Sequence, residues 1–538
     1  MVAFAEDRYV YEALTRFNYF PNQKNAVGEM PPVFKTNSFT PEIAELLITS
    51  ANLSKERKKS GFDQVSYSIT RHNNVPRTLG LMHPYACAQL AKHIYDNWTE
   101  IAHITKNVNS MIKPEIHVDG RIMIMNYEDA DQKAVRTLTE GFGKRFRVNT
   151  DISGCFNNIY THSIPWAVLG FDQAKENVKA GGPKSHWADK LDAFQSFANR
   201  KETNGVPIGP ATSSVVVELV LGAVDKALVD SGFKFNRYID DYICFCSTYE
   251  DAQRFIRVLG SALGGLKLNI NLQKTHITEL PEPMSDEWVS HLSSVIPSPL
   301  IDDDNGRRKL TSSEVLQYLD YAVRLNKSTP DGSVLKYAIS SIMYSLRPHD
   351  TAVFRYVINL CWYYPVLIPY LDILIDGGEL DAADYVEQFN SLIVENAKNT
   401  RSDGMAWPLY FLIKHKLQPS EEAISAVVES KDCVSLTCLF KLLPECAELI
   451  AFIKEVAGSS DYERDEYWLL LYQCFLKGVI DNPYNDKVFN LLKQYKVDFT
   501  PSSIALTKAE HYCDYIGNPF VDDDFKFESF KVYCQKNN

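Results

Sequence analysis

Two adjacent carboxylates, Asp240 and Asp241, interrupt a run of the chain that is otherwise apolar and aromatic. The tyrosine, isoleucine, cysteine and phenylalanine residues around them (237–246) are typical of a half-buried β-hairpin. A buried strand does not tolerate paired acids unless each carboxylate has a partner or a metal. This conflict is resolved if the two aspartates lie at the tip of the hairpin and hold a divalent cation.

Length and composition indicate an ordinary soluble protein with more than one domain. A chain of 538 residues is too long for a single hydrophobic core, so two or three domains are expected. No apolar run approaches the length of about 18 residues that marks a membrane span, and the N-terminus lacks a signal-peptide pattern. The 11 cysteines form no Cys-x-x-Cys pair, which favours a reduced, cytoplasmic protein over a disulfide or zinc scaffold. We therefore expect no membrane partner.

The net charge of −12 is distributed unevenly along the chain. Residues 301–538 carry roughly −11 of it and residues 1–300 only roughly −1. The first part also contains local basic runs at 55–59, 71–77 and 144–147. A basic channel for nucleic acid in the first part is therefore compatible with the overall acidity.

The composition changes near residue 281, where prolines and then an acidic Asp302–Gly306 stretch indicate a boundary loop. Beyond about residue 310 the apolar periodicity is helical, with short turns and no strict repeat, which is typical of an irregular α-solenoid or helical bundle. The helices are expected at 313–326, 334–346, 351–363, 365–375, 381–398, 405–416, 421–430, 434–455, 463–478 and 486–495.

The first part mixes strand and helix patterns. A strand is expected over 145–152, ending at Asp151, and another over 266–270. Helices are expected at 85–94, 213–228 and 249–263, the second of them opened by the turn Gly205–Pro210.

Asp151, Asp240 and Asp241 form a candidate two-metal site. Nucleotidyl transfer uses two divalent ions, and Mg²⁺ takes oxygen ligands from few protein carboxylates, leaving the rest to phosphates and water. Asp151 and Asp240 are expected to bridge the ions, with Asp241 close by and the Ile152 carbonyl as a backbone ligand; Mn²⁺ is the alternative to Mg²⁺. Alone, an Asp-Asp pair is usually a solvated turn and an Asp after a strand a helix cap. Together with the Gly-Pro-Gly turn, in this order and spacing, they indicate the palm domain of a polymerase.

On these motifs the chain resembles the reverse transcriptases. Asp151–Phe156 corresponds to the family's motif A, Gly205–Gly209 to motif B, Tyr238–Asp241 to the Tyr-x-Asp-Asp of motif C, and Leu266–Lys274 to motif D. The resemblance implies that the three aspartates are catalytic. It implies nucleotide-binding roles for Phe156, Arg77, Arg71, Gly205, Pro207, Gly209, Tyr238 and Lys274.

Two of these implied roles have a physical reason. A bulky ring at Phe156 lies under the sugar in the family and would clash with a 2′-hydroxyl, which selects deoxynucleotides. Its alternative is a core aromatic. Arg71 and Arg77 lie in the fingers-like region, where a guanidinium can hold a triphosphate through two hydrogen bonds; for Arg71 the alternative is a surface charge.

The string Tyr160–Trp166, directly after motif A, narrows the resemblance. Together with the helical second half, it is similar to the abortive-infection reverse transcriptases of the AbiK type, which are bacterial antiphage proteins. The implied fold class is α+β, with reverse-transcriptase fingers and palm at 1–295 followed by an all-α helical-repeat domain, a HEAT-like solenoid, at 296–538. The implied activity is untemplated, tyrosine-primed addition of dNTPs in the bacterial cytoplasm. Single-stranded DNA, covalently attached to a homo-oligomeric protein, would be the product.

Three departures weaken the case for a processive copying enzyme. Template-copying relatives usually carry a glutamine where this chain has Ile208, and residues 210–213 differ from the usual Ser-Pro-Leu-Ser. No basic, thumb-like helix follows motif D. The priming residue stays open among 29 tyrosines, which include Tyr9, Tyr11 and Tyr19.

Other interpretations remain. A structured noncoding RNA could serve as template or cofactor for the same fold. A non-catalytic scaffold with a degenerate palm is disfavoured because all three aspartates are present. An intron-encoded or retroviral copying enzyme is the least supported, since no nuclease, integrase or RNase H segment is recognisable.

Overall fold

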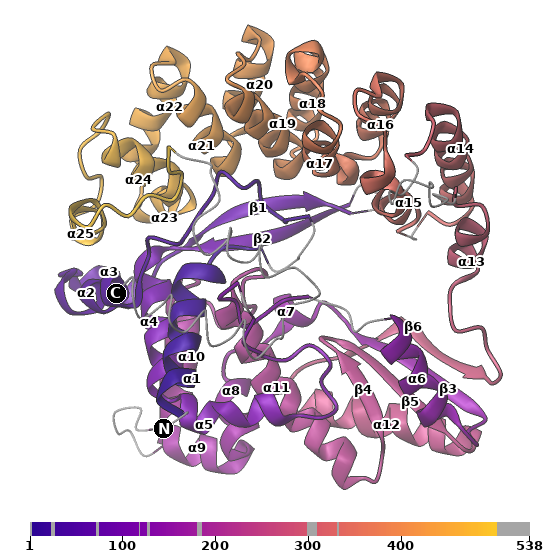
Figure 1. Cartoon of the computed structure of the whole chain (residues 1–538). Helices are drawn as coiled ribbons and strands as arrows, with labels where there is room; N and C mark the ends of the chain where they lie inside the picture. Colours follow the sequence, from indigo (N-terminus) through magenta and orange to yellow (C-terminus); the bar gives the residue numbers. More distant parts are fainter. Residues whose placement is uncertain are drawn as a thin grey trace.

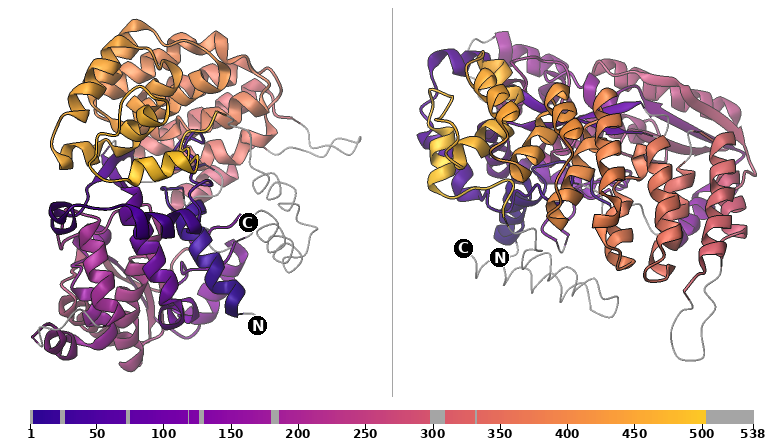
Figure 2. Two further views of the ribbon diagram at one scale, coloured as in Figure 1. Left: turned by 90° about the vertical axis from the view of Figure 1, so that its left-hand side faces the viewer. Right: turned by 90° about the horizontal axis from the view of Figure 1, so that it is seen from above.

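The structure is a computed structural model in which a mixed helix-and-sheet region lies below an arc of helices (Figure 1). Two further views show the same arc lying against one side of the first part of the chain (Figure 2). The residues that the structure describes are 3–22, 27–71, 75–117, 119–125, 130–179, 186–297, 309–330 and 333–502.

The strands form two separate antiparallel units. The four-stranded sheet has the order β4-β5-β3-β6, and β1 pairs with β2 as an isolated hairpin. The bounds are β1 Gln64–Thr70, β2 Pro76–Met82, β3 Phe146–Ile152, β4 Phe235–Tyr238, β5 Asp241–Cys246 and β6 Ile270–Glu279.

Helices cover one face of the four-stranded sheet. On β5, Tyr242, Cys244 and Cys246 are buried on that face, and their apolar side chains explain why the strand packs there. The helix α11 beneath them is apolar on nearly all sides and is buried over most of its length. The helices of this part are α1 Ala3–Glu12, α2 Pro41–Ser50, α3 Lys55–Ser60, α4 Pro84–Asp96, α5 Trp98–Ile101, α6 Ala130–Gly141, α7 Cys155–Asn158, α8 Ser163–Leu169, α9 Phe171–Lys179, α10 Trp187–Phe197, α11 Ala211–Asp230, α12 Tyr249–Gly265 and α13 Glu287–Ser294.

The rest of the chain is helical and forms two rows (Figure 1). In the outer row α14, α16, α18, α20 and α22 follow one another, and in the inner row α19, α21 and α24 do so. Among the described residues, none of these or the earlier helices has the length and apolar character needed to cross a membrane. The bounds are α14 Ser312–Ser328, α15 Val334–Ile342, α16 Thr351–Tyr363, α17 Tyr370–Gly377, α18 Val386–Lys398, α19 Ser402–His415, α20 Glu421–Ser430, α21 Cys433–Leu442, α22 Ala447–Ala457, α23 Asp461–Glu466, α24 Trp468–Leu476 and α25 Val488–Gln494.

Side chains at the start of α19 accept hydrogen bonds from the backbone amides on the outer edge of β1. The carboxylate of Asp403 accepts hydrogen bonds from the Thr70 amide (2.8 Å) and the Thr70 hydroxyl (2.9 Å). The Ser402 hydroxyl accepts from the Ser68 amide at 2.9 Å. Because an exposed strand edge leaves backbone donors unpaired, these contacts both cap the hairpin and fix it to the helical arc.

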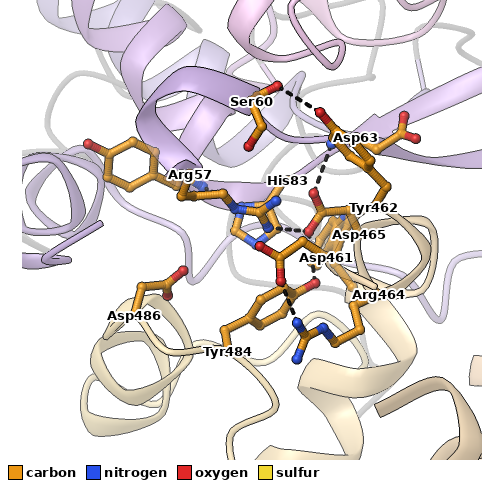
Figure 3. A network of polar contacts seen from close by, with 12 residues as sticks. Arg57, Ser60, Asp63, His83, Asp461, Tyr462, Arg464, Asp465, Tyr484 and Asp486 are labelled. Carbon is orange, nitrogen blue, oxygen red and sulfur yellow. Dashed lines mark hydrogen bonds and ion pairs between the residues drawn. The ribbon is translucent and has the colours of Figure 1, made fainter. Parts of the chain in front are cut away.

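A buried polar network joins α3 and β1 to α23 (Figure 3). Asp465 is completely buried and forms an ion pair with Arg57. It also accepts hydrogen bonds from the Asp63 amide and the Tyr484 hydroxyl, both at 3.0 Å. Arg57 stacks its guanidinium 3.9 Å from the centre of the Phe62 ring. A charged pair of this kind, enclosed between two parts of the chain, requires that both parts stay docked.

Most of the predicted elements are confirmed, and several differ in detail; the helix expected over 365–375, for example, is a 3-10 turn at 365–367 followed by α17. The predicted helices at 351–363 and 421–430 have those bounds in the structure. The helix expected over 434–455 is divided into α21 and α22, with Pro444 between them, and the one over 463–478 into α23 and α24. The strand expected over 266–270 is misplaced: residues 266–268 turn back on the end of α12 through hydrogen bonds to residues 263 and 264, and β6 begins at Ile270.

Replacing Arg57 with alanine should destabilise the docking of α23 and α24. The substitution leaves the buried carboxylate of Asp465 without its counter-ion, which costs about 3–5 kcal/mol in comparable buried pairs. Chemical denaturation should show this loss, and hydrogen exchange should increase first in α23 and α24. An exposed pair, tested by Lys226→Ala on α11, should cost less than about 1 kcal/mol. Equal losses in the two variants would contradict the assignment.

Candidate active site

The turn between β4 and β5 places the aspartate pair. β4 ends at Tyr238 and β5 begins at Asp241, so that Ile239 and Asp240 form a two-residue turn. Ile239 has φ = +60°, in the left-handed region that glycine usually takes at the first position of such a turn. For a β-branched residue this conformation costs about 1–3 kcal/mol, so the surrounding structure must hold it in place.

The sheet register brings Asp151 to the same place. Asp151 is paired directly with Asp241 across β3 and β5, and paired residues present their side chains on one face. The Ile152 amide donates to the Asp240 carbonyl at 3.2 Å, which ties the turn to the end of β3. Asp151 is buried, Asp240 half-buried and Asp241 exposed. The three predicted aspartates therefore lie together at one end of β3 and β5, the two central strands of the sheet.

These carboxylates repel one another. Burial, followed by the charges of Asp151 and Asp241, raises the pKa of Asp240 to about 6, against the opposing effect of Arg77. Partial desolvation of its carboxylate by the surrounding residues, followed by the charge of Asp151, also raises the pKa of Asp241, although the side chain keeps contact with solvent. The Lys274 ammonium lies 2.6 Å from a carboxylate oxygen of Asp151 and offsets part of this charge. One lysine beside three acids leaves an excess of negative charge that divalent cations would neutralise.

The residues fit divalent ions of the kind that polymerases use. Within the described ranges, no group of three or more His, Cys, Asp or Glu side chains is arranged to hold a metal ion by itself. Catalytic Mg²⁺ needs only one or two protein carboxylates per ion, since phosphates and water complete its octahedron. Asp151, Asp240 and Asp241 supply hard oxygen ligands of this type at an open edge. The carbonyl of Ile152 as a further ligand stays a prediction.

A pocket next to the turn contains several of the predicted nucleotide-binding residues. Arg77, Phe156 and Gly209 line it together with Ile239 of the turn. Ile208 of the predicted Gly205–Gly209 turn lines it as well and gives this part of the wall an apolar side chain. No sequence motif indicated its other lining residues, which are Glu29, Ile112, Met123, Ile124, Met125, Ser214, Val217 and Glu218.

The predicted Gly205–Gly209 turn connects Phe156 to the β1–β2 hairpin. The Val206 amide donates to the Phe156 carbonyl, and the Gly80 amide of β2 donates to the Ile208 carbonyl, both at 2.9 Å. Gly209 has φ = +126°, and a Cβ there would lie 2.7 Å from the Pro21 ring. Glycine is therefore required at Gly209 both by its backbone conformation and by the close packing. Pro207 packs against the open side of Gly80.

Tyr238 is covered by α6. Arg136 donates to the Tyr238 hydroxyl, and the Lys133 ammonium and the Arg136 guanidinium lie 5.8 and 5.7 Å from the centre of its ring. No sequence motif pointed to these two cations. Arg71 lies beyond the end of β1, is exposed, and does not line the pocket.

The N-terminal tyrosines are enclosed in the fold. Tyr11 and Tyr19 have no exposed surface, and Tyr9 is only 6% exposed. The Tyr19 hydroxyl donates to the Met82 carbonyl at 2.6 Å. In this conformation none of the three can reach a nucleotide, so none is supported as a priming residue.

Comparison with known proteins identifies the domain that holds this site. Residues 92–320 match the family described as reverse transcriptase (RNA-dependent DNA polymerase). This range contains Asp151, the Gly205–Gly209 turn and the Asp240–Asp241 pair. The chain thus carries a reverse transcriptase domain, which is a nucleotidyltransferase of the RNA-directed DNA polymerase class.

No curated protein matches the chain. Among solved structures, apo telomerase from Candida tropicalis matches with a TM-score of 0.32 and 11% identity, over 77% of this chain and 71% of that one. Telomerase from Candida albicans, in complex with a fragment of telomeric RNA, matches with a TM-score of 0.27 and 11% identity, over 80% of this chain and 70% of that one. Scores this low carry no argument about fold or function.

Replacing Asp240 with asparagine should stabilise the metal-free protein. The pKa of Asp240 is raised from 3.8 to about 6 in the folded state, so ionisation of Asp240 destabilises the fold progressively above pH 3.8 and fully above about pH 6. The gain should be about 2–3 kcal/mol at pH 8, about half of that at pH 5, and absent below the unfolded-state pKa. Denaturation in EDTA at the two pH values measures it, with Asp230→Asn as an exposed control on α11. A loss of stability at pH 8 would contradict the repulsion among the three acids.

Proposed function

We propose that the chain is a DNA polymerase that adds deoxynucleotides at the Asp151–Asp240–Asp241 site. The observation that carries this proposal is the register of β3 and β5, which sets Asp151 opposite Asp241 beside a pocket lined by Arg77 and Phe156. Mg²⁺, or Mn²⁺ in its place, held by these carboxylates would supply Lewis-acid chemistry for the attacking hydroxyl and for the triphosphate.

The other residues have supporting roles in this proposal. Arg77 would hold the triphosphate, because its charge already acts on Asp240 and its side chain lines the pocket. Phe156 would pack against the deoxyribose and exclude a 2′-hydroxyl. Lys274 forms an ion pair with Asp151, and its ammonium would be placed to neutralise the outgoing phosphate. Arg71, which is exposed beyond β1, would assist only if the hairpin closes.

We further propose that this polymerase belongs with the abortive-infection reverse transcriptases and adds dNTPs without a template, primed by a tyrosine. Ile208 supports this, because an apolar side chain in the pocket cannot make the polar contacts that a glutamine makes. Residues 296–538 would then be a HEAT-like repeat domain, which the two stacked rows of helices support. The product would be single-stranded DNA attached to a homo-oligomeric protein in the bacterial cytoplasm, acting in antiphage defence.

A polymerase that copies a noncoding RNA is the second candidate. The family match itself favours it, since the family is described as RNA-dependent. Sequencing the nucleic acid that co-purifies with the protein separates the two. A bound RNA and products of defined sequence support copying, whereas products whose composition follows nucleotide affinity support untemplated addition.

Incubation with labelled dNTPs and Mg²⁺, without primer or template, should leave label on the denatured protein. The double substitution Asp240→Ala and Asp241→Ala should abolish incorporation, because it removes two ligands of the ions. Asp230→Ala, at an exposed position on α11, should incorporate normally. Label in solution but none on the denatured wild-type protein would exclude protein priming. Unchanged incorporation by the double variant would exclude the site itself.

Replacing Phe156 with alanine should relax the choice of sugar. Without the ring, a 2′-hydroxyl no longer clashes, and the ratio of NTP to dNTP incorporation should rise about tenfold or more, as for comparable changes of pocket shape. Competition between labelled dATP and ATP measures this ratio. Phe171→Ala, at an exposed position outside the pocket, should leave the ratio unchanged. An unchanged ratio in the Phe156 variant would assign the ring to the core alone.

A further inference from the structure

A buried arginine lies directly beneath the turn that carries Asp240. Arg237 is the third residue of β4, and its side chain has no exposed surface. Its backbone is held on the outer side of the strand, where its amide donates to the Asn109 carbonyl (2.7 Å) and its carbonyl accepts from the Met111 amide (2.8 Å). The side chain therefore starts from a fixed point on the helix-covered face of the sheet.

All five N–H donors of this guanidinium are used. Nη1 donates to the Ile239 carbonyl at 2.9 Å and to Glu218 at 2.8 Å. Nη2 donates to Glu218 at 3.0 Å and to Asp225 at 2.8 Å, and Nε donates to both oxygens of Asp225, at 3.1 and 3.0 Å. Lysine has no planar fork and could not make this set of contacts.

The two acids come from one face of α11 and are themselves held. Glu218 and Asp225 are seven residues apart, two helical turns, and both are buried. Asp225 also accepts hydrogen bonds from the Tyr242 hydroxyl (3.1 Å) and the Asn107 side chain (2.6 Å). A buried arginine with two acids is a costly arrangement that well-packed apolar residues could replace, so its presence here calls for a role in geometry.

The contact to Ile239 connects this network to the metal site. The carbonyl of Ile239 is held by Arg237, and the carbonyl of Asp240 is held by the Ile152 amide, so both peptide groups of the turn are fixed. Ile239 is the residue with the left-handed backbone. A strained turn persists only where its surroundings determine it, and among the described residues Arg237 is a side chain that donates a hydrogen bond to this turn.

We propose that Arg237 is a positioning residue: it holds the Ile239–Asp240 turn in its left-handed form and thereby sets the direction of the Asp240 carboxylate towards the ions shared with Asp151. This inference rests on the proposed function, since it requires that the aspartates bind metal. Glu218 and Asp225 act through Arg237. The role resembles that of residues behind a metal ligand, whose loss lowers metal affinity or activity by about 10–100-fold.

The test compares Arg237→Lys with Arg57→Lys. Both variants remove a buried, ion-paired guanidinium, but Arg57 lies in the network with Asp465, on the other side of this part of the chain from β4 (Figure 1). Binding of Mn²⁺ alone is followed by electron paramagnetic resonance, incorporation of dNTPs is titrated with Mg²⁺, and the melting temperature is recorded for each protein. A crystal structure of Arg237→Lys gives the conformation of Ile239.

Arg237→Lys should weaken Mn²⁺ binding and raise the half-saturating Mg²⁺ concentration about tenfold or more. In its crystal structure Ile239 should leave the left-handed region. Arg57→Lys should lower the melting temperature and leave metal binding unchanged. Normal metal binding and an unchanged turn in Arg237→Lys would overturn the proposal, as would equal weakening of metal binding by Arg57→Lys.

Two further outcomes are decided by the same measurements. If wild-type protein binds no Mn²⁺, the proposed function fails, and the crystal structure still decides whether Arg237 holds the turn. If Arg237→Lys does not fold, Glu218→Gln replaces it, because that variant keeps the arginine and removes one charge that orients it. It should weaken metal binding in the same direction by a smaller factor, and unaltered binding would overturn the proposal.

Discussion

The pairing of β3 with β5 is the constraint on which the rest of the site depends. It sets Asp151 directly opposite Asp241, so that carboxylates distant in the sequence share one face at one edge of the sheet. A shift of one residue would turn Asp151 towards the helices, where its neighbours Thr150 and Ile152 now lie. The apolar residues on the covered face of β5 fix this register, because they can be buried in only one of the two alignments. The burial of apolar side chains on the covered face of the sheet thus determines which carboxylates lie together on the opposite face.

The charge gathered at this edge is costly, and several parts of the structure maintain it. Burial, together with the charges of Asp151 and Asp241, raises the pKa of Asp240 to about 6, and Ile239 adopts a strained backbone in the same turn. Natural proteins keep such costs mainly at functional sites. The Gly205–Gly209 turn and the β1–β2 hairpin bring Phe156 and Arg77 to the pocket beside the aspartates. The helices α19 and α23 hold that hairpin by accepting hydrogen bonds from its backbone amides and from the residue before it. The helical arc therefore contributes to the site indirectly, by fixing the hairpin.

Much of this could be predicted from the sequence because the signals are local. The alternation at 145–152, the apolar flanks of the aspartate pair and the 3.6-residue periodicity beyond residue 310 specify their elements directly. The misplaced strand at 266–270 shows where local patterns fail. Its alternating apolar residues are typical of a strand, but residues 266–268 belong to the turn that ends α12, and β6 begins only at Ile270. Contacts between residues far apart in the chain could not be predicted. Arg237 has the pattern of an ordinary strand residue, and its pairing with Glu218 and Asp225 is formed only because α11 lies under β4. The same holds for the cover of Tyr238 by α6.

The central claim is that Asp151, Asp240 and Asp241 bind two divalent ions for nucleotidyl transfer. The most direct measurement is a crystal structure of the protein with Mn²⁺ and a non-hydrolysable deoxynucleoside triphosphate, with the metals located by anomalous scattering. We expect two Mn²⁺ ions about 3.5–4 Å apart between the carboxylates of Asp151 and Asp240, with the sugar against Phe156. Nucleotide bound elsewhere, or no anomalous signal at these aspartates, would contradict it.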